Sequence, residues 1–208
     1  MIQVACKYAD NYFCKNIVTD AVRPILCAGC QFRSFAKGQL LTINYWSRAF
    51  TVLADGLLVV GYQDHTSDKL FVTGIASSGG VVGAAKIFPD CPTEMTGRIV
   101  HCVTKCTTAV FNDYAYEEAL KDEEFANNLV RYCFQLYWYE KEDFIRAIGS
   151  RDTTEAVRYI VKYCTDHGIP ALTHEQIALM CNRARPTVTN ILHELTLEEP
   201  SLFQKWNK

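Results

Sequence analysis

The chain has 208 residues, a formal net charge of −2 and 49% hydrophobic residues. This combination excludes a disordered chain, and the length allows one domain or two small ones with a buried core. The longest uncharged run that could be considered for a bilayer, residues 70–85, is too short and contains Ser77-Ser78-Gly79-Gly80. The first residues lack the pattern of a signal peptide, so we expect a cytoplasmic protein with no membrane partner.

Short apolar runs broken by turn residues predict a β-rich region over residues 35–111. Asp55-Gly56 separates two of the runs and predicts a tight hairpin, because glycine tolerates the positive φ of such turns. Short strands at this spacing favour a sandwich or barrel over βαβ units. The residues before 35 show no regular period. The clearest predicted strand segments are residues 50–53, 57–60, 70–73 and 109–111.

Residues 117–148 contain no Gly or Pro and predict one long helix. A second apolar face is added by Cys133, Phe134, Tyr137 and Trp138, so the helix must be covered on two sides. One cover is the β region, and the other is the same helix of a second subunit, although a core helix of a single monomer is an alternative. The first apolar stripe consists of Phe125, Leu129, Tyr132, Leu136 and Tyr139.

Gly149-Ser150 marks a domain joint, after which short helical patterns continue to the end of the chain. Asp152 and Thr173 resemble helix caps, and the last predicted helix spans residues 185–195. The predicted organisation is therefore a sensing β domain over residues 1–116, a dimerisation helix and hinge over 117–149, and a DNA-binding domain over 150–208.

Residues 172–195 carry the most specific pattern in the chain. Two short helices joined by a three- or four-residue turn predict a helix-turn-helix, with Ile177, Ala178, Val188 and Ile191 facing inward. No acidic residue lies between Glu175 and Glu194. A structural bundle with a merely solvated face is the alternative. The predicted base contacts are Arg185, Thr187, Thr189 and Asn190, with Pro186 in the same helix turn and Thr173, Arg183 and His193 near phosphates.

The motifs Gln176-Ile177-Ala178, residues 185–188 and residues 191–195 resemble the DNA-binding motif of the Crp/Fnr family of bacterial transcriptional regulators. Lys37-Gly38, Gly56 and the Val82-Gly83 pair with Phe88 resemble landmarks of the same family's cyclic-nucleotide-binding-like domain. The resemblance implies an α+β fold: an N-terminal antiparallel β-barrel of jelly-roll type, a dimerisation helix and a C-terminal helix-turn-helix. It also implies a homodimer on an inverted-repeat operator and a small-molecule effector of unknown identity.

Three departures from the family pattern change what we expect. Gly83 is followed by Ala84 rather than by the acidic residue that holds a ribose hydroxyl, so we predict that cyclic AMP is not the effector. The short segment after Leu197 predicts a reduced or absent wing, and Pro186 predicts an operator that differs from the family's best-known one. The candidate effector-pocket residues are Gly83, Ala84, Arg98, Phe134 and Trp138.

Ten cysteines are many for this length, and in a reducing compartment we expect thiols or ligands rather than disulfides. Some members of the resembled family hold an iron–sulfur cluster. Here the spacing matches no ferredoxin pattern, so buried packing, cluster ligation and a thiol switch stay open. The candidate cluster or switch residues are Cys6, Cys14, Cys27 and Cys30, with Cys91, Cys102 or Cys106 as candidates in the β region.

The sequence thus predicts a DNA-binding transcriptional regulator that acts as a homodimer, with RNA polymerase as a further candidate partner. No phosphate loop, zincin motif or nucleophile elbow indicates an enzyme. The rival hypothesis is a ligand or redox sensor, or an interaction protein, with a vestigial DNA-binding domain. The neutral overall charge and the short C-terminal segment favour that rival.

Overall fold

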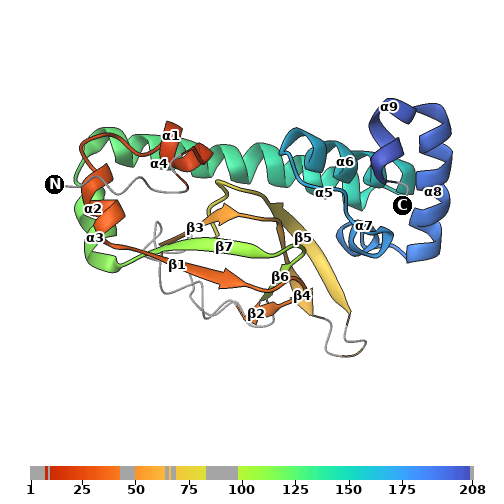
Figure 1. Ribbon diagram of the computed structural model, residues 1–208, viewed down its shortest axis with the longest axis horizontal. Helices are drawn as coiled ribbons and strands as arrows, with labels where there is room; N and C mark the ends of the chain where they lie inside the picture. The colour runs from red at the N-terminus through yellow and green to blue at the C-terminus, as the bar shows by residue number, and fades with distance from the viewer. Residues whose placement is uncertain are drawn as a thin grey trace.

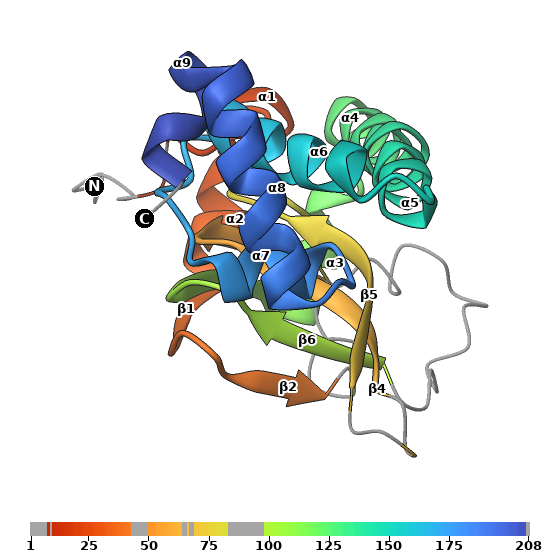
Figure 2. The same ribbon diagram turned by 90° about the vertical axis from the view of Figure 1, so that its right-hand side faces the viewer.

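The fold was obtained as a computed structural model that describes residues 8, 10–42, 50–63, 66, 69–82 and 98–206. A helical rod runs along one side of the molecule, two β-sheets lie beneath part of it, and a group of short helices forms the far end (Figure 1). Seen from that end, α7 and α8 lie in front of the sheets, while α4 and α5 lie to one side (Figure 2). No helix within the described ranges is long and apolar enough to cross a membrane.

The described strands form two antiparallel sheets, which confirms the predicted antiparallel β architecture, and no closed barrel forms among the described strands. The sheet orders are β1-β7-β3 and β2-β6-β4-β5, and no described strand of one sheet pairs with a strand of the other. The bounds of the first sheet are β1 Cys30–Phe35, β3 Phe50–Asp55 and β7 Cys106–Phe111. Those of the second are β2 Leu40–Thr42, β4 Leu58–Gln63, β5 Leu70–Ala76 and β6 Arg98–Cys102.

Three short connections carry the chain from one sheet to the other, between β1 and β2, β3 and β4, and β6 and β7. Gly56 has φ +104°, as its predicted turn requires. The strands on either side of it do not pair, however, because β3 bonds to β7 and β4 bonds to β5 and β6. The turn at Asp55-Gly56 is therefore confirmed, whereas the hairpin is wrong. The four predicted strand segments fall in β3, β4, β5 and β7.

Two short helices occupy the N-terminal segment in which the sequence showed no period. They are α1 (Tyr12–Asn16) and α2 (Arg23–Ala28). The side chain of Asn11 accepts a hydrogen bond from the backbone N–H of Phe13 at 2.8 Å and caps α1. Phe13 and Leu26 are buried against the first sheet and the start of the rod, so tertiary packing supports helices that are too short to be periodic.

The rod begins later than predicted, because Asp122 starts a new helix. The side chain of Asp122 accepts from the backbone N–H of Phe125 at 2.8 Å. This cap separates α3 (Asp113–Ala119) from the rod, which is made of α4 (Glu123–Gln135), a π-helical turn (Leu136–Glu140) and α5 (Lys141–Gly149). The predicted single helix over 117–148 is thus divided near its start.

The π-helical turn also explains where the predicted apolar stripe ends. Phe125, Leu129 and Tyr132 are buried, whereas Tyr139 is 64% exposed. A π-turn closes its hydrogen bonds over five residues instead of four, so it shifts the residues that follow it around the helix axis. Beyond residue 136 the side chains therefore no longer follow the spacing on which the prediction was based.

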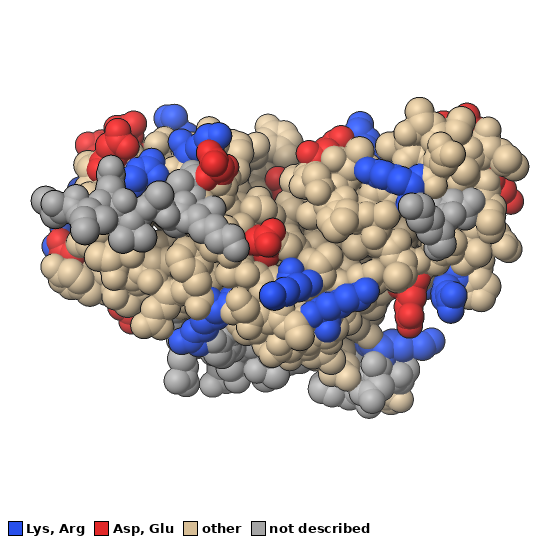
Figure 3. Space-filling view, viewed as in Figure 1, with Lys and Arg blue, Asp and Glu red and all other residues tan. Residues whose placement is uncertain are grey.

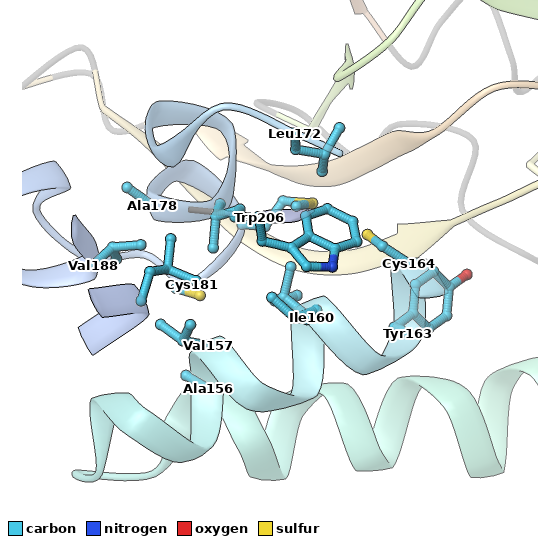
Figure 4. Packing of buried hydrophobic residues seen from close by; sticks show 14 of the residues in the cluster. Ala156, Val157, Ile160, Tyr163, Cys164, Leu172, Ala178, Cys181, Val188 and Trp206 are labelled. Carbon is cyan, nitrogen blue, oxygen red and sulfur yellow. The ribbon is translucent and has the colours of Figure 1, made fainter. Parts of the chain in front are cut away.

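The C-terminal helices share one apolar core with the second sheet (Figure 4). Leu57, Val59, Val72 and Val103 from the β region belong to the same cluster as Ile160, Ile177, Val188 and Trp206. The C-terminal region is consequently docked on the sheets rather than tethered by a linker. Its elements are α6 Thr153–Asp166, α7 His174–Met180, α8 Arg185–Glu198, α9 Pro200–Phe203 and a 3-10 turn Gln204–Trp206.

Candidate nucleic-acid interface

A short turn at residues 181–184 joins α7 to α8, and the three together are called the α7–turn–α8 unit. Thr173 caps α7 by accepting from the backbone N–H of Gln176, and the Gln176 side chain accepts from the Thr173 N–H at 3.0 Å. Ile177 and Ala178 of α7 and Val188 of α8 are buried between the helices. The small side chain of Ala178 lets the two helices approach closely. Ala184 precedes α8 and provides no side-chain cap, as expected from its methyl group.

The turn between the two helices is held by Asn182, which is one of the residues that sequence reasoning missed. Asn182 has φ +54°, and no other non-glycine residue in the described ranges has a positive φ. Its side chain accepts from the Val72 N–H and donates to the Val72 carbonyl, both at 2.8 Å. β5 is an edge strand of its sheet, so this amide occupies backbone groups that another strand would otherwise pair with. An Asn in a short turn was a signal for positive φ, but its partner lies 110 positions away.

One side of α8 presents polar groups to solvent. Arg185, Pro186, Thr187, Asn190 and His193 are all exposed. Arg185 and Pro186 occupy the first helical turn, and Asn190 and His193 follow one and two turns later on the same side. Arginine and amide side chains can donate and accept in patterns that match guanine and adenine edges, so this face has the chemistry of base readout.

Thr189 does not belong to that exposed face. It is half-buried, and its hydroxyl lies 3.0 Å from Nδ1 of His174, whose Nε2 lies 3.2 Å from the carbonyl of Trp206. His174, another residue that the sequence analysis missed, thus links α7, α8 and the C-terminal segment. The hydrogen bond with His174 leaves Thr189 poorly placed for the predicted base contact.

The Arg183 side chain is also hydrogen-bonded within the protein. Its guanidinium donates to the carbonyls of Ser150 at 2.8 Å and Ile148 at 3.4 Å, and to the hydroxyl of Thr153 at 3.3 Å. These acceptors lie at the junction of α5 and α6. The geometry gives Arg183 a positioning role, in which it fastens the turn before α8 to the end of the rod.

The segment after α8 is helical in the residues described, from Pro200 to Trp206. α9 and the 3-10 turn fold back on the C-terminal core, where Phe203 and Trp206 are 0% and 1% exposed. Lys205 lies over the Trp206 ring, 5.0 Å from its centroid. The burial of these two aromatic side chains stabilises the helical course of this segment.

Of the five predicted effector-pocket residues, the structure describes the side chains of Phe134 and Trp138. Gly83 and Ala84 lie outside the described residues, as does the side chain of Arg98, whose backbone begins β6. Phe134 and Trp138 stack on each other with ring centroids 5.6 Å apart and are 59% and 53% exposed on the rod. A shallow groove beside Phe134 on the rod is open to solvent rather than enclosed by the sheets.

The N-terminal cysteines do not form a recognisable cluster within the described part of the chain. Cys14 lies in α1, Cys27 in α2 and Cys30 at the start of β1, while Cys6 is outside the described residues. No group of three or more His, Cys, Asp or Glu residues among the described positions is arranged to hold a metal ion. Cys91 also falls outside these positions, and Cys102 and Cys106 are buried.

A polar seam joins the β region to the helices. The Tyr132 hydroxyl donates to the Gly79 carbonyl at 2.9 Å, and the Tyr163 hydroxyl lies 3.1 Å from that of Ser77. Burial raises the pKa of the Glu140 carboxyl above its ordinary value, partly opposed by nearby His167. Glu140, in the π-helical turn, therefore lies near His167 at the C-terminal end of α6.

Charge on the molecule is mixed. Lys and Arg side chains are scattered along the lower edge of the face in Figure 3, with acidic side chains between them. Within α8, Arg185 is a cation on the exposed side, and Glu194 is the first acidic residue that follows it. A nucleic-acid contact at this face would therefore depend on shape and hydrogen bonding more than on a broad positive field.

These features define two antiparallel sheets, a helical rod and a group of C-terminal helices that share one apolar core with the second sheet. No protein-family model matches the sequence, and no curated protein matches it. Solved structures do match, and they confirm the predicted resemblance at the level of the fold: the chain has the fold of Crp/Fnr-family transcriptional regulators.

Three solved structures illustrate this likeness. One, from Eubacterium rectale, is described as a Crp/Fnr-family transcriptional regulator; it has TM-score 0.60 and 13% identity over 87% of this chain and 85% of its own. The c-di-GMP responsive global regulator CLP of Xanthomonas campestris has TM-score 0.59 and 12% identity over 86% and 93%. A cyclic nucleotide-binding domain containing protein from Listeria monocytogenes has TM-score 0.61 and 11% identity over 86% and 88%.

Proposed function

We propose that the protein is a transcriptional regulator that binds double-stranded DNA as a homodimer, with α8 as the recognition helix in the major groove. The observation that carries the proposal is the exposed polar side of α8, free of acidic residues from Arg185 to His193, on a rigid α7–turn–α8 unit. The fold that it shares with Crp/Fnr regulators supports the same function.

In this proposal the exposed residues of the α7–turn–α8 unit contact DNA, and the residues that are hydrogen-bonded within the protein support them. Arg185, Thr187 and Asn190 contact base edges, with the Arg185 guanidinium pairing with a guanine. Pro186 has no backbone N–H to donate and contributes shape alone. His193 and the exposed cap residue Thr173 lie at the margins of the unit, where phosphates pass. Arg183 and Thr189 act indirectly, because their polar groups hold the unit together.

The second subunit would pack on the exposed apolar side of the rod. Val130, Phe134 and Trp138 are 57%, 59% and 53% exposed and follow one another at four-residue intervals. A soluble protein rarely leaves such a contiguous stripe in water, and the same stripe from a second copy would bury it. Two rods packed in this way would present two α8 helices to one duplex, which requires half-sites about 10 base pairs apart.

Selection from a random duplex library with purified full-length protein tests the proposal. An enriched inverted repeat whose half-site centres lie about 10 base pairs apart is the expected result. Failure to enrich any sequence at low salt, where phosphate contacts are strongest, would contradict it. A matched Arg185→Ala protein in the same selection distinguishes enrichment through α8 from enrichment through the tag or the matrix.

A sensor or interaction protein with a vestigial DNA-binding domain is the second candidate. The specific observation in its favour is the helical C-terminal segment where a two-stranded wing would add phosphate contacts. Salt dependence separates the two functions, because true phosphate contacts make affinity fall steeply as salt rises. A duplex affinity that changes little with salt would favour the second candidate.

A further inference from the structure

Two buried thiols lie together at the corner where β6 passes into β7. Cys102 ends β6 and Cys106 begins β7, so that a connection of Val103, Thr104 and Lys105 separates them. Cys102 and Cys106 are 0% and 1% exposed within one apolar cluster. The two thiols are near enough for each to affect the pKa of the other. The fold thus preassembles a dithiol, whereas the sequence analysis considered each of these cysteines only as a separate ligand candidate.

The two thiols are chemically unequal. The interaction between their side chains lowers the pKa of Cys106 below the ordinary thiol value and raises the pKa of Cys102. The Cys106 sulfur also lies 3.3 Å from the Leu57 carbonyl and 3.4 Å from that of Thr104. A low-pKa thiol beside a high-pKa partner is the arrangement of an attacking and a resolving cysteine. By contrast, burial raises the pKa values of Cys164 and Cys181 in the C-terminal core to about 12.

Glycine at position 56 leaves one flank of the Cys106 sulfur without a covering side chain. A Cβ at this position would lie 2.9 Å from the Cys106 sulfur and 2.5 Å from the Lys105 carbonyl. Gly56 is only half-buried, and Lys105 is exposed. On this flank the Cys106 sulfur is therefore covered by the backbone of Gly56, which is itself partly exposed.

The same connection is the point at which the β region contacts α7. The side-chain amide of Gln176 donates to the Val103 carbonyl, and Val103 is buried in the C-terminal core cluster. The backbone N–H groups of Val103 and Thr104 donate to the Leu57 carbonyl at 3.0 and 3.2 Å. Any change in geometry between the two cysteines must therefore be absorbed next to Gln176, in the first helix of the α7–turn–α8 unit.

We propose that Cys102 and Cys106 are a redox-active dithiol that a hydroperoxide converts into an intramolecular disulfide, shifting the 103–105 connection against α7. The Cys106 thiolate attacks one peroxide oxygen, the O–O bond breaks, and a sulfenic acid and, after protonation, water are formed. The Cys102 sulfur then attacks the sulfenic sulfur, forms the S–S bond and releases the second water. The dithiol loses two electrons, and the peroxide gains them. The effect on DNA affinity rests on the proposed function, whereas the disulfide does not.

The chain allows a direct test of the disulfide, because Lys105 lies between the two cysteines. Trypsin cleaves after Arg98, Lys105 and Lys121, so reduced protein yields peptides 99–105 and 106–121 separately. Full-length protein is treated with hydrogen peroxide, blocked with N-ethylmaleimide while native and again after denaturation, digested without reductant, and analysed by mass spectrometry. We expect the two peptides to remain joined and to separate on adding dithiothreitol. Separate peptides with blocked thiols, or a sulfinic acid without the cross-link, would overturn the proposal.

Duplex binding by the same samples tests the coupling. We expect oxidation to lower affinity for the selected duplex by at least about fivefold, the lower end of usual allosteric coupling, and dithiothreitol to restore it. Cys102→Ala and Cys106→Ala should each abolish the response, while Cys164→Ala, a matched buried cysteine, should keep it. A cross-link in a protein that binds no duplex in either state supports the dithiol and contradicts the DNA-binding proposal. If peroxide cross-links the protein but leaves its affinity for the duplex unchanged, the proposed coupling to DNA binding is wrong.

Discussion

The side-chain amide of Asn182 pairs with both backbone groups of Val72, accepting from its N–H and donating to its carbonyl at 2.8 Å each. Asn182 lies in the turn before α8, and Val72 lies on the edge strand β5. One side chain thereby fixes the orientation of the α7–turn–α8 unit relative to the sheets and also covers part of an open sheet edge. The α7–turn–α8 unit, which we propose binds DNA, is therefore hydrogen-bonded directly to the β region.

Replacing Asn182 with glycine should remove the two hydrogen bonds to Val72 while keeping the positive φ of the turn. Glycine accepts φ +54° without strain, so Asn182→Gly removes the two hydrogen bonds and leaves the turn intact. We expect a loss of about 1–3 kcal/mol in the free energy of unfolding in urea, because two buried backbone groups lose their partners. Glycine at exposed Lys162 of α6 is a control for the added chain flexibility. An unchanged urea midpoint would show that the amide pairing contributes nothing.

Arg185 and Arg183 should respond differently to alanine. Arg185 is exposed at the start of α8, so Arg185→Ala should relax preference at one base position at a cost of about 1–3 kcal/mol, with folding unaffected. Arg183 bonds to the Ser150 and Ile148 carbonyls, so Arg183→Ala should lower the thermal midpoint and weaken all duplexes through poor positioning. Competition binding with single-base operator variants, read beside thermal unfolding, checks both. Loss of base preference only in Arg183→Ala would reverse the assignment.

A charge on the exposed side of the rod should keep the protein monomeric. Trp138→Glu places a carboxylate in the stripe that we propose buries against a second copy, and an unpaired charge in an apolar interface is costly. Light scattering coupled to size-exclusion chromatography should report a mass near two chains for the parent and near one for the variant. Tyr114→Glu is a matched control, since Tyr114 is 69% exposed on α3 away from the stripe. Two equal masses for parent and Trp138→Glu would contradict this interface.

Glu140 should make stability decline as pH rises. Its pKa is raised in the folded protein by burial, so the folded state holds the proton more tightly than the unfolded state. Between the ordinary carboxyl value of 4.5 and the raised value, the unfolded state binds fewer protons, and the free energy of unfolding falls with increasing pH. Glu140→Gln should be more stable than the parent at neutral pH and nearly equal to it in acid. Thermal midpoints of both proteins from pH 4 to pH 8, roughly the range in which carboxyl groups and histidine titrate, measure this difference. Parallel curves would contradict the prediction.

The local patterns in the sequence were sufficient for the elements whose stability is local. The capping pair Thr173 and Gln176, the apolar contacts of Ile177 and Val188, and the positive φ of Gly56 follow from neighbouring residues, and the structure contains each of them. The same holds for the predicted strand segments in β3, β4, β5 and β7. These features depend on periodicity and on the steric needs of single residues, and both can be read from a short window.

Partners far apart in the chain were decided only by the tertiary structure. The turn at Gly56 was predictable, but hydrogen bonding of β3 to β7 sends its two strands into different sheets. Arg183 and Thr189 have the composition of DNA contacts, yet Ser150 and His174 engage their polar groups. Long-range pairing depends on which surfaces the whole chain can bury together, and no local pattern carries that information. The sequence by itself therefore determined the elements and the type of domain, whereas the packing of the C-terminal core on β5 decided which polar side chains stay exposed.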